Sequence, residues 1–336
     1  MPLPAIPNHV AGFQGINQTT WGTAETLTPA TDGLYPYLGD GLPPAPFPFG
    51  YLFEGGRGRA VNSLLKLPMV VPAGRAAETQ FQCFFKGAGT AYASAAVLPP
   101  NEVHRLLQWA GFDATFSTNK WLYTLTAAGL GYKFGTYGYY AQGKSHLLRD
   151  VLADWSYVID GVGIPIHTFN LRGVVSANRA TLSLPSITYP RETVDPPVAK
   201  ASVFGIGSFV TPVTQKGGFS LGRQFGNPRA RVNEADGHMG WVPTGFDPEM
   251  TFSIEQTALE STPFHASTGL DPDKLKEAMT GITVSQQIGA TSLFRWSVSM
   301  TNAQCSKAEP ANDDAIAMWD LAFKPSSLST ITVTLD

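Results

Sequence analysis

Short segments in which apolar and polar residues alternate recur along the chain, and this period of two limits the possible folds more than any other feature. The first clear case follows Glu78, where Thr79, Phe81, Cys83 and Phe85 share one side of an extended chain. The same pattern, broken by Gly, Asn and Pro, predicts strands over residues 121–126, 132–140, 155–159, 166–175, 180–189, 250–254, 294–300, 319–323 and 331–335. Many short strands are typical of β-sandwiches and barrels.

Two segments have helical spacing instead. After Pro100, apolar residues recur at intervals of three and four until Gly111, which is a typical C-terminal stop. Asp271 to Asp273 predict the capped start of a second short helix that ends at Gly281. Because the order strand, helix, strands occurs in both halves of the chain, we expect two related modules.

The expected organisation is mainly β, with two sandwich or barrel modules over residues 59–195 and 196–336, each with a short α-helix. Residues 1–58 show no clear period, and residues 34–50 are rich in Pro, Gly and aromatic side chains. Since proline fixes an extended geometry and removes a backbone donor, an extended N-terminal arm is predicted there. The alternative is a flap that packs on its own domain. The hypothesis for residues 34–53 is that they reach a neighbouring subunit or ring.

The chain carries little charge for its size. Only 15% of its 336 residues are charged, and the formal net charge is -3. A typical soluble domain has about a quarter charged residues, so much of this surface is expected to be covered by other subunits. A broad basic face for nucleic acid is excluded. No signal peptide or apolar run of membrane-spanning length is visible, and Cys83 and Cys305 are expected to be free thiols in strands.

One motif resembles a catalytic site. The segment from Gly218 through Ser220 to Gly222 has the spacing of a nucleophile elbow, and candidate partners follow it. These partners are Asp236 or Asp247, and His238 or His265. An elbow requires a helix after the serine, and residues 223–228 do not favour one.

Other catalytic or ligand-binding signals are weaker. The turn at Gly87 and Gly89 has Tyr92 where a dinucleotide motif needs glycine, and Lys276 and Ile282 break a calcium-loop pattern after Asp271. The histidines are scattered, at positions 9, 104, 146, 167, 238 and 265. We therefore predict no catalytic, cofactor-binding or metal-binding residues, and no enzymatic activity.

The order of segments resembles the tail tube proteins, or major tail proteins, of long-tailed bacteriophages. The segments that carry the likeness span residues 59–336 and are short: 60–62, 86–91, 106–112, 123–124, 146–173, 243–249 and the C-terminal strands. Residues 1–58 and 201–240 depart from the pattern. The resemblance implies a self-assembling virion protein that continues its sheets from subunit to subunit and forms stacked rings.

The resemblance also implies partners and a location. Three two-module chains, or six chains, would form a ring, and rings would stack helically into a hollow tail tube. Viral DNA would pass through the lumen without specific binding, and tape measure, terminator and distal tail proteins would be neighbours. Assembly would take place in the host bacterial cytoplasm, with no membrane and no cofactor involved.

Two other classes of function remain open from the sequence. One is a serine hydrolase centred on Ser220. The other is a carbohydrate-binding or other virion β-sandwich protein, including a capsid decoration protein, in which Trp121, Tyr137 and Tyr139 are exposed and stack on sugar rings.

Overall fold

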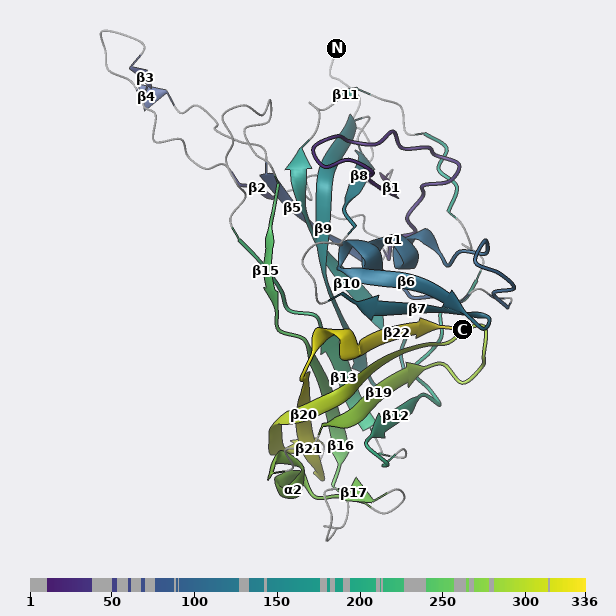
Figure 1. The fold of residues 1–336 in the computed structure, drawn as a ribbon, viewed down its shortest axis with the longest axis vertical. Coiled ribbons are helices and arrows are strands. Elements are labelled where there is room, and N and C mark those ends of the chain that lie inside the picture. The colour runs from purple at the N-terminus through teal and green to yellow at the C-terminus, as the bar shows by residue number, and fades with distance from the viewer. Residues whose placement is uncertain are drawn as a thin grey trace.

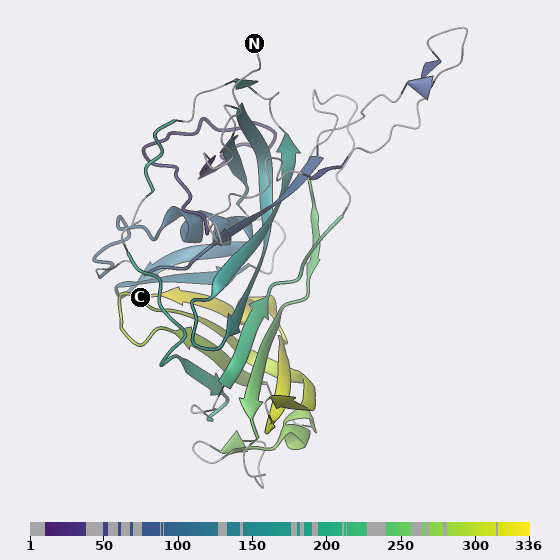
Figure 2. The ribbon, with the colours of Figure 1, turned by 180° about the vertical axis from the view of Figure 1, so that it is seen from behind.

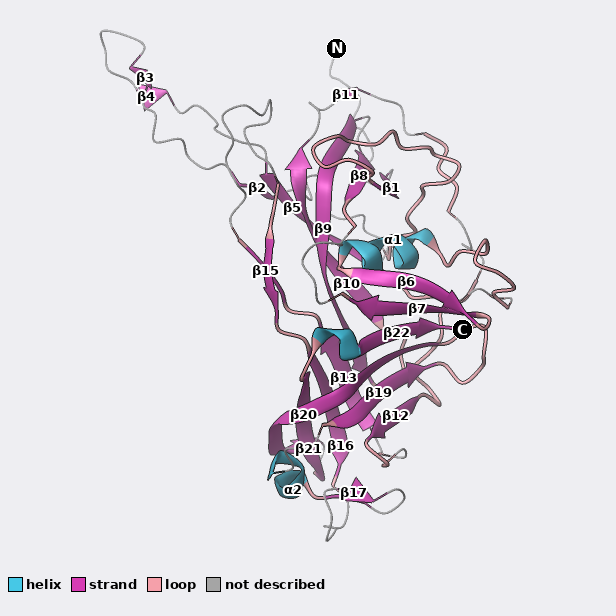
Figure 3. Cartoon of the chain, in the orientation of Figure 1, coloured by secondary structure: helices cyan, strands magenta, loops and turns pink. Residues whose placement is uncertain are grey.

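A computed structural model describes residues 11–37, 50–52, 60–61, 68–69, 76–87, 89, 91–126, 133–141, 144–175, 180–181, 185–189, 194–209, 212, 214–226, 240–256, 264–265, 269–277, 281–313 and 315–336. The described part is mainly β, as predicted, with few helices (Figure 1 and Figure 3). None of its helices is long and apolar enough to cross a membrane. The Pro-rich stretch 38–49 of the expected arm lies outside these residues.

The elements of the first part of the chain are β1 (Ala11–Asn17), β2 (Gly50–Leu52), β3 (Ala60–Val61), β4 (Pro68–Met69), β5 (Ala76–Cys83), α1 (Asn101–Trp109), β6 (Phe112–Ser117), β7 (Lys120–Leu125), β8 (Gly135–Ala141), β9 (Lys144–Asp160), β10 (Ile166–Val175) and β11 (Ala180–Thr181). Those of the second part are β12 (Val203–Ile206), β13 (Thr214–Ser220), β14 (Arg223–Phe225), β15 (Pro243–Phe246), β16 (Glu249–Glu255), β17 (Phe264–His265), β18 (Gly269–Leu270), α2 (Pro272–Glu277), β19 (Ile282–Ile288), β20 (Trp296–Asp313), β21 (Ile316–Pro325), the 3-10 helix η1 (Leu328–Thr330) and β22 (Ile331–Leu335).

Within the described residues, sixteen strands are hydrogen-bonded into one sheet that forms two layers. In the first layer, one edge of the long strand β9 pairs with β10. Its other edge pairs first with β8 and then, near the end of β9, with β13. Beyond β13, the sheet continues with β16 and then β21. The second layer contains β12, β19, β20, β22, β7 and β6, in that order. The long strand β20 joins the layers, because its second half pairs with β21. Figure 2 shows the same arrangement from behind.

Aromatic side chains fill the space between the layers. Phe85 stacks on His167 with ring centroids 3.5 Å apart, and Trp155 stacks on the same imidazole. From the second layer, Trp296 meets His167 and Tyr157 edge to face. Because such pairs add to the free energy gained by area burial, this cluster holds the two layers together.

The helix α1 closes one end of the core. Its Trp109 side chain is fully buried, and its indole N–H donates to the Asn17 side chain at 2.7 Å. Gly15 of β1 and Gly135 of β8 lie directly against the indole, where any side chain would collide with it. Gly111, with a φ of 105°, ends the helix as predicted.

Residues 11–37 lie on the sheet, which corrects the expectation of an extended arm for this stretch. β1 pairs with β8 over seven residues, and Phe13 and Leu34 are buried in the core. Arg105 of α1 forms an ion pair of 2.9 Å with Asp32. Tertiary pairing decided this local structure, and Gly and Pro content alone gave no sign of it.

The proposed boundary between residues 195 and 196 stays a prediction. Two pairs of described strands cross it, β9 with β13 and β7 with β22. One buried apolar cluster also contains residues from both sides of the boundary. The strand expected over residues 180–189 is confirmed only at β11, because residues 185–189 are not in a strand.

Candidate assembly edges

The second layer is an open sheet with two ends. In Figure 1 its strands lie side by side, from β6 in the middle of the view to β12 below. All neighbouring strands in this layer are antiparallel. Met300 pairs with both β19 and β22, and Thr332 pairs with both β20 and β7, so the inner strands have partners on both edges. In the described part, β6 and β12 are the two end strands.

The strand β6 presents backbone groups to an open edge. Thr118 and Asn119, with φ of 47° and 62°, form a two-residue turn of the type that joins twisted hairpins. Ser117 and Lys120 are therefore the closing hydrogen-bonded pair. In an antiparallel pair, every second residue of a strand bonds to the partner strand and the residues between them point their backbone groups away. The N–H and C=O groups of residues 112, 114 and 116 therefore point away from β7.

An independent hydrogen bond supports this alternation. The Thr126 N–H donates to the Gly111 carbonyl at 3.1 Å, which continues the bonded series 117, 115, 113 and 111 toward β7. The segment Phe112–Ser117 contains no proline or lysine, which are the residues that commonly protect edge strands. In the described part no strand pairs with its outward edge, and the helix α1 lies on the side of β6 opposite β7 (Figure 1).

The strand β12 forms the other end. The Gly207 N–H donates to Thr283 at 2.8 Å, so odd-numbered residues of β12 bond toward β19. The Ile206 N–H points the other way and donates to Phe209 at 2.9 Å. On that outward side the Phe209 N–H also donates to Ile206, and the Ser202 N–H donates to Ala199, both at 3.1 Å. Among the described residues, the open part of this edge is therefore the backbone of Phe204.

Exposed apolar side chains surround the open edge of β12. Val203 is 47% exposed, and Val162, Ile164 and Val198 are 72%, 39% and 45% exposed. Their segments are tied together, because the Ala199 N–H donates to Gly163 at 2.8 Å. Such a group beside an open strand is typical of an interaction site.

A third strand edge is protected. In the second half of β20, pairing of Asp313 with Ile316 places Ala308 and Pro310 on the edge away from β21. Pro310 has no N–H to offer. The Ala308 carbonyl accepts a hydrogen bond of 3.3 Å from Lys276 of α2. By contrast, no described strand pairs with the outward side of β6.

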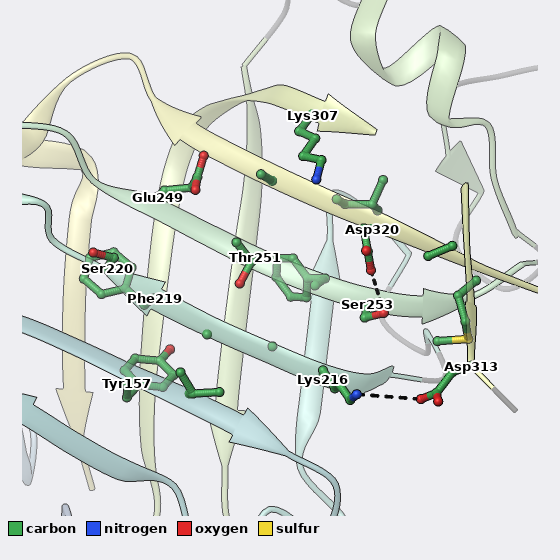
Figure 4. Close-up of a pocket in the computed structure, with 18 of the residues that line it drawn as sticks. Tyr157, Lys216, Phe219, Ser220, Glu249, Thr251, Ser253, Lys307, Asp313 and Asp320 are labelled. Atoms are coloured by element: carbon green, nitrogen blue, oxygen red, sulfur yellow. Dashed lines mark hydrogen bonds and ion pairs between the residues drawn. The ribbon is translucent and has the colours of Figure 1, made fainter. Parts of the chain in front are cut away.

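Ser220 lacks the surroundings of a nucleophile elbow. It is the last residue of β13, and the strand β14 follows it where the motif requires a helix. Ser220 lines a groove of about 740 Å³. Figure 4 shows it with Glu249, Asp320 and Lys216 among the lining residues. No described histidine lines this groove. Asp247 is paired instead with Lys324 at 2.7 Å, while Asp236 and His238 lie outside the described residues.

The aromatic residues expected to stack on sugars are buried. Trp121, Tyr137 and Tyr139 are 6%, 1% and 1% exposed, because their side chains point into the core. The carbohydrate-binding alternative required these side chains to be exposed, and their burial contradicts that premise. The groove in Figure 4 has no solvent-facing aromatic side chain either, since Tyr157, Phe219 and Phe252 are buried.

The described histidines and cysteines form no cluster that could hold a metal ion. Burial lowers the pKa of His104 to about 4 and that of His167 well below its usual value. Both cysteines are free, with Cys83 buried and Cys305 half-buried. Burial raises the pKa of both thiols, which disfavours the reactive thiolate. His9 lies outside the described residues.

No family model matches the chain, and no curated protein matches it. The functional argument therefore stands on the sheet edges and the surface chemistry.

Proposed function

We propose that this chain is a structural subunit that forms a ring by joining β6 of one copy to β12 of the next. The observation that carries the proposal is the pair of open edges at opposite ends of one sheet. Unpaired backbone N–H and C=O groups form a template for another strand. A head-to-tail contact between two different edges generates a closed ring when the rotation between copies closes.

The strand directions fit such a contact. Six strands alternate in direction across the layer, so β12 and β6 of one copy run in opposite directions. Copies related by rotation about one axis keep the same strand directions. When β6 of one copy meets β12 of the next, the pair is therefore antiparallel, and the whole closed sheet keeps one pairing mode.

Barrel geometry favours three copies. A trimer would have 18 strands and, at a strand spacing of about 4.8 Å and a tilt of about 40°, a backbone diameter of about 36 Å. Barrels of this strand number enclose an aqueous channel. A hexamer would double the diameter to about 72 Å by the same relation. The trimer therefore gives the channel width that known barrels of this strand number enclose, although each sheet must curve more than in a hexamer.

The resemblance to tail tube proteins gives the ring its proposed role. Stacked rings would form a phage tail tube, and viral DNA would pass through it. The low charge content and the net charge of -3 support a surface covered by other copies and a channel without a strong basic lining. The location would be the virion tail, with tape measure, terminator and distal tail proteins as neighbours.

The experiment is to purify the chain and follow its mass by light scattering over a concentration series, with negative-stain electron microscopy of the same samples. Rings or hollow tubes that grow with concentration are the expected result. A monomer at every concentration and salt condition, with no ring in the images, would refute the proposal. Labelling with a fluorophosphonate tests the hydrolase alternative, and modification of Ser220 would favour it.

A further inference from the structure

One face of the six-stranded layer is covered by hydroxyl side chains. Paired positions across the sheet form the row Gly205, Ser285, Ser299, Thr332, Thr124 and Asp113. The next row on the same face contains Val203, Gln287, Ser297, Thr334, Leu122 and Thr115. We call these two rows the hydroxyl face. Its members are half-buried or exposed, apart from Gly205.

The opposite face of the same strands is the core. The intervening row contains Phe204, Gln286, Val298, Val333, Tyr123 and Ala114, and most of these are buried. The first layer packs on that side, as the contacts of Trp296 with Tyr157 and His167 show. In a closed ring, one face of this layer points into the lumen and the other points outward. Because the first layer of each copy covers the core face, the core face points outward and the hydroxyl face points into the lumen.

We propose that the hydroxyl face lines the channel of the assembled ring and forms a neutral, hydrated wall along which a DNA duplex slides without adhering. The proposal rests on the ring of the preceding section and adds which face is inside and what its chemistry does. Seven of its side chains are serine or threonine, at positions 115, 124, 285, 297, 299, 332 and 334.

The side chains of this face do not favour strong binding of a DNA duplex or of another protein. Affinity for a duplex comes mainly from lysine and arginine at the phosphates, and neither row contains one. Protein interfaces are enriched in aromatic residues and arginine, which the two rows also lack. The one charged member, Asp113, is negative and repels phosphate. Lys120 and Arg295 lie beyond the rows, and both are paired with Asp336.

Cysteine labelling tests the position of this face. The variants Ser299→Cys and Thr251→Cys would be made in a Cys305→Ser background, in which Cys83 remains buried. Thr251 is an exposed residue on the outer side of the first layer and serves as the control. Dissociated subunits and assembled tubes would be treated with a small maleimide and with a maleimide attached to a large polymer.

The expected result is that Ser299→Cys loses its reaction with the large reagent on assembly but keeps its reaction with the small one. Thr251→Cys should react with both in either state. Tubes in which Ser299→Cys reacts fully with the large reagent would overturn the inference while leaving the ring proposal intact. If no rings form, both proposals fail.

Co-sedimentation with a linear duplex tests the lack of adhesion. Wild-type tubes should retain no duplex at low salt. Retention that weakens as salt is added would contradict a neutral wall, because that dependence indicates phosphate contacts with cationic groups. A Thr332→Lys variant provides the positive control, since it should retain duplex in a salt-sensitive way.

Discussion

A proline at the open edge of β6 should separate assembly from folding. The Ala114 N–H faces away from β7, so Ala114→Pro removes no hydrogen bond within the subunit. Its ring would occupy the position that the neighbouring strand needs. The matched control is Thr115→Pro, because the Thr115 N–H faces β7 opposite Leu122. That variant should lose a bond inside the hairpin.

The size of the effect follows from the number of bonds at the contact. Each backbone hydrogen bond contributes about 0.5–1.5 kcal/mol net, and the proline removes one donor and displaces its neighbours. A loss of about 1–3 kcal/mol at each contact between copies is expected on that basis. Since about 1.4 kcal/mol corresponds to a factor of ten, the concentration required for assembly should rise about ten- to a hundredfold.

Sedimentation velocity over a concentration series measures assembly, and thermal unfolding of the dissociated subunit measures stability. Ala114→Pro should keep the melting temperature of the wild-type subunit and fail to assemble at concentrations where the wild type does. Thr115→Pro should lower the melting temperature. Normal assembly of Ala114→Pro would refute the assignment of β6 as an interface strand.

The remaining predictions concern the subunit itself. Gly135→Ala should destabilise it by about 1–3 kcal/mol, because a Cβ there collides with the Trp109 ring, and urea unfolding measures the loss. Tyr157→Phe should lower the free energy of unfolding by about 1–3 kcal/mol, because the Gln286 carbonyl loses its 2.8 Å bond from the tyrosine hydroxyl. His104→Gln should make the pH dependence of stability shallower below pH 6.5, where the unfolded chain binds a proton that the folded chain, with a His104 pKa of about 4, does not. The wild type should therefore lose stability relative to this variant by about 1.4 kcal/mol for each pH unit between 6.5 and 4.

For each of these predictions, one result would contradict the reasoning. Gly163→Ala is the glycine control, because the nearest atom to its new Cβ is 3.8 Å away, and equal effects at Gly163 and Gly135 would argue against the Trp109 contact. Unchanged stability of Tyr157→Phe would mean that Gln286 finds another donor. Identical pH profiles for the wild type and His104→Gln would show that His104 titrates normally in the folded subunit.

The strands with alternating apolar residues could be predicted from the sequence because burial on one face is a local signal. β10, β16, β22 and α1 appear where the periodicity placed them. β6 and β13 were missed. In β13, Gly217 and Gly218 interrupt any alternation, and β6 has only partly buried apolar residues after Phe112. Strands of this kind are held by their neighbours and carry little signal of their own.

The open edges could not be predicted from the sequence, since an edge is a property of the pairing between distant strands. β7 meets β22 from the other end of the chain, and only this pairing makes β6 an end strand. The hydroxyl face had a local signal in the C-terminal strand, where Thr332 and Thr334 alternate with core residues. Its extent across six strands depends on the register, which single-strand patterns do not contain.

The most direct test of the central claim is a cryo-electron microscopy map of the assembled protein. The account predicts rings in which β6 of each copy lies antiparallel beside β12 of the next, with backbone hydrogen bonds at Ala114 and Phe204. Rings held by other surfaces, with β6 facing solvent, would contradict it.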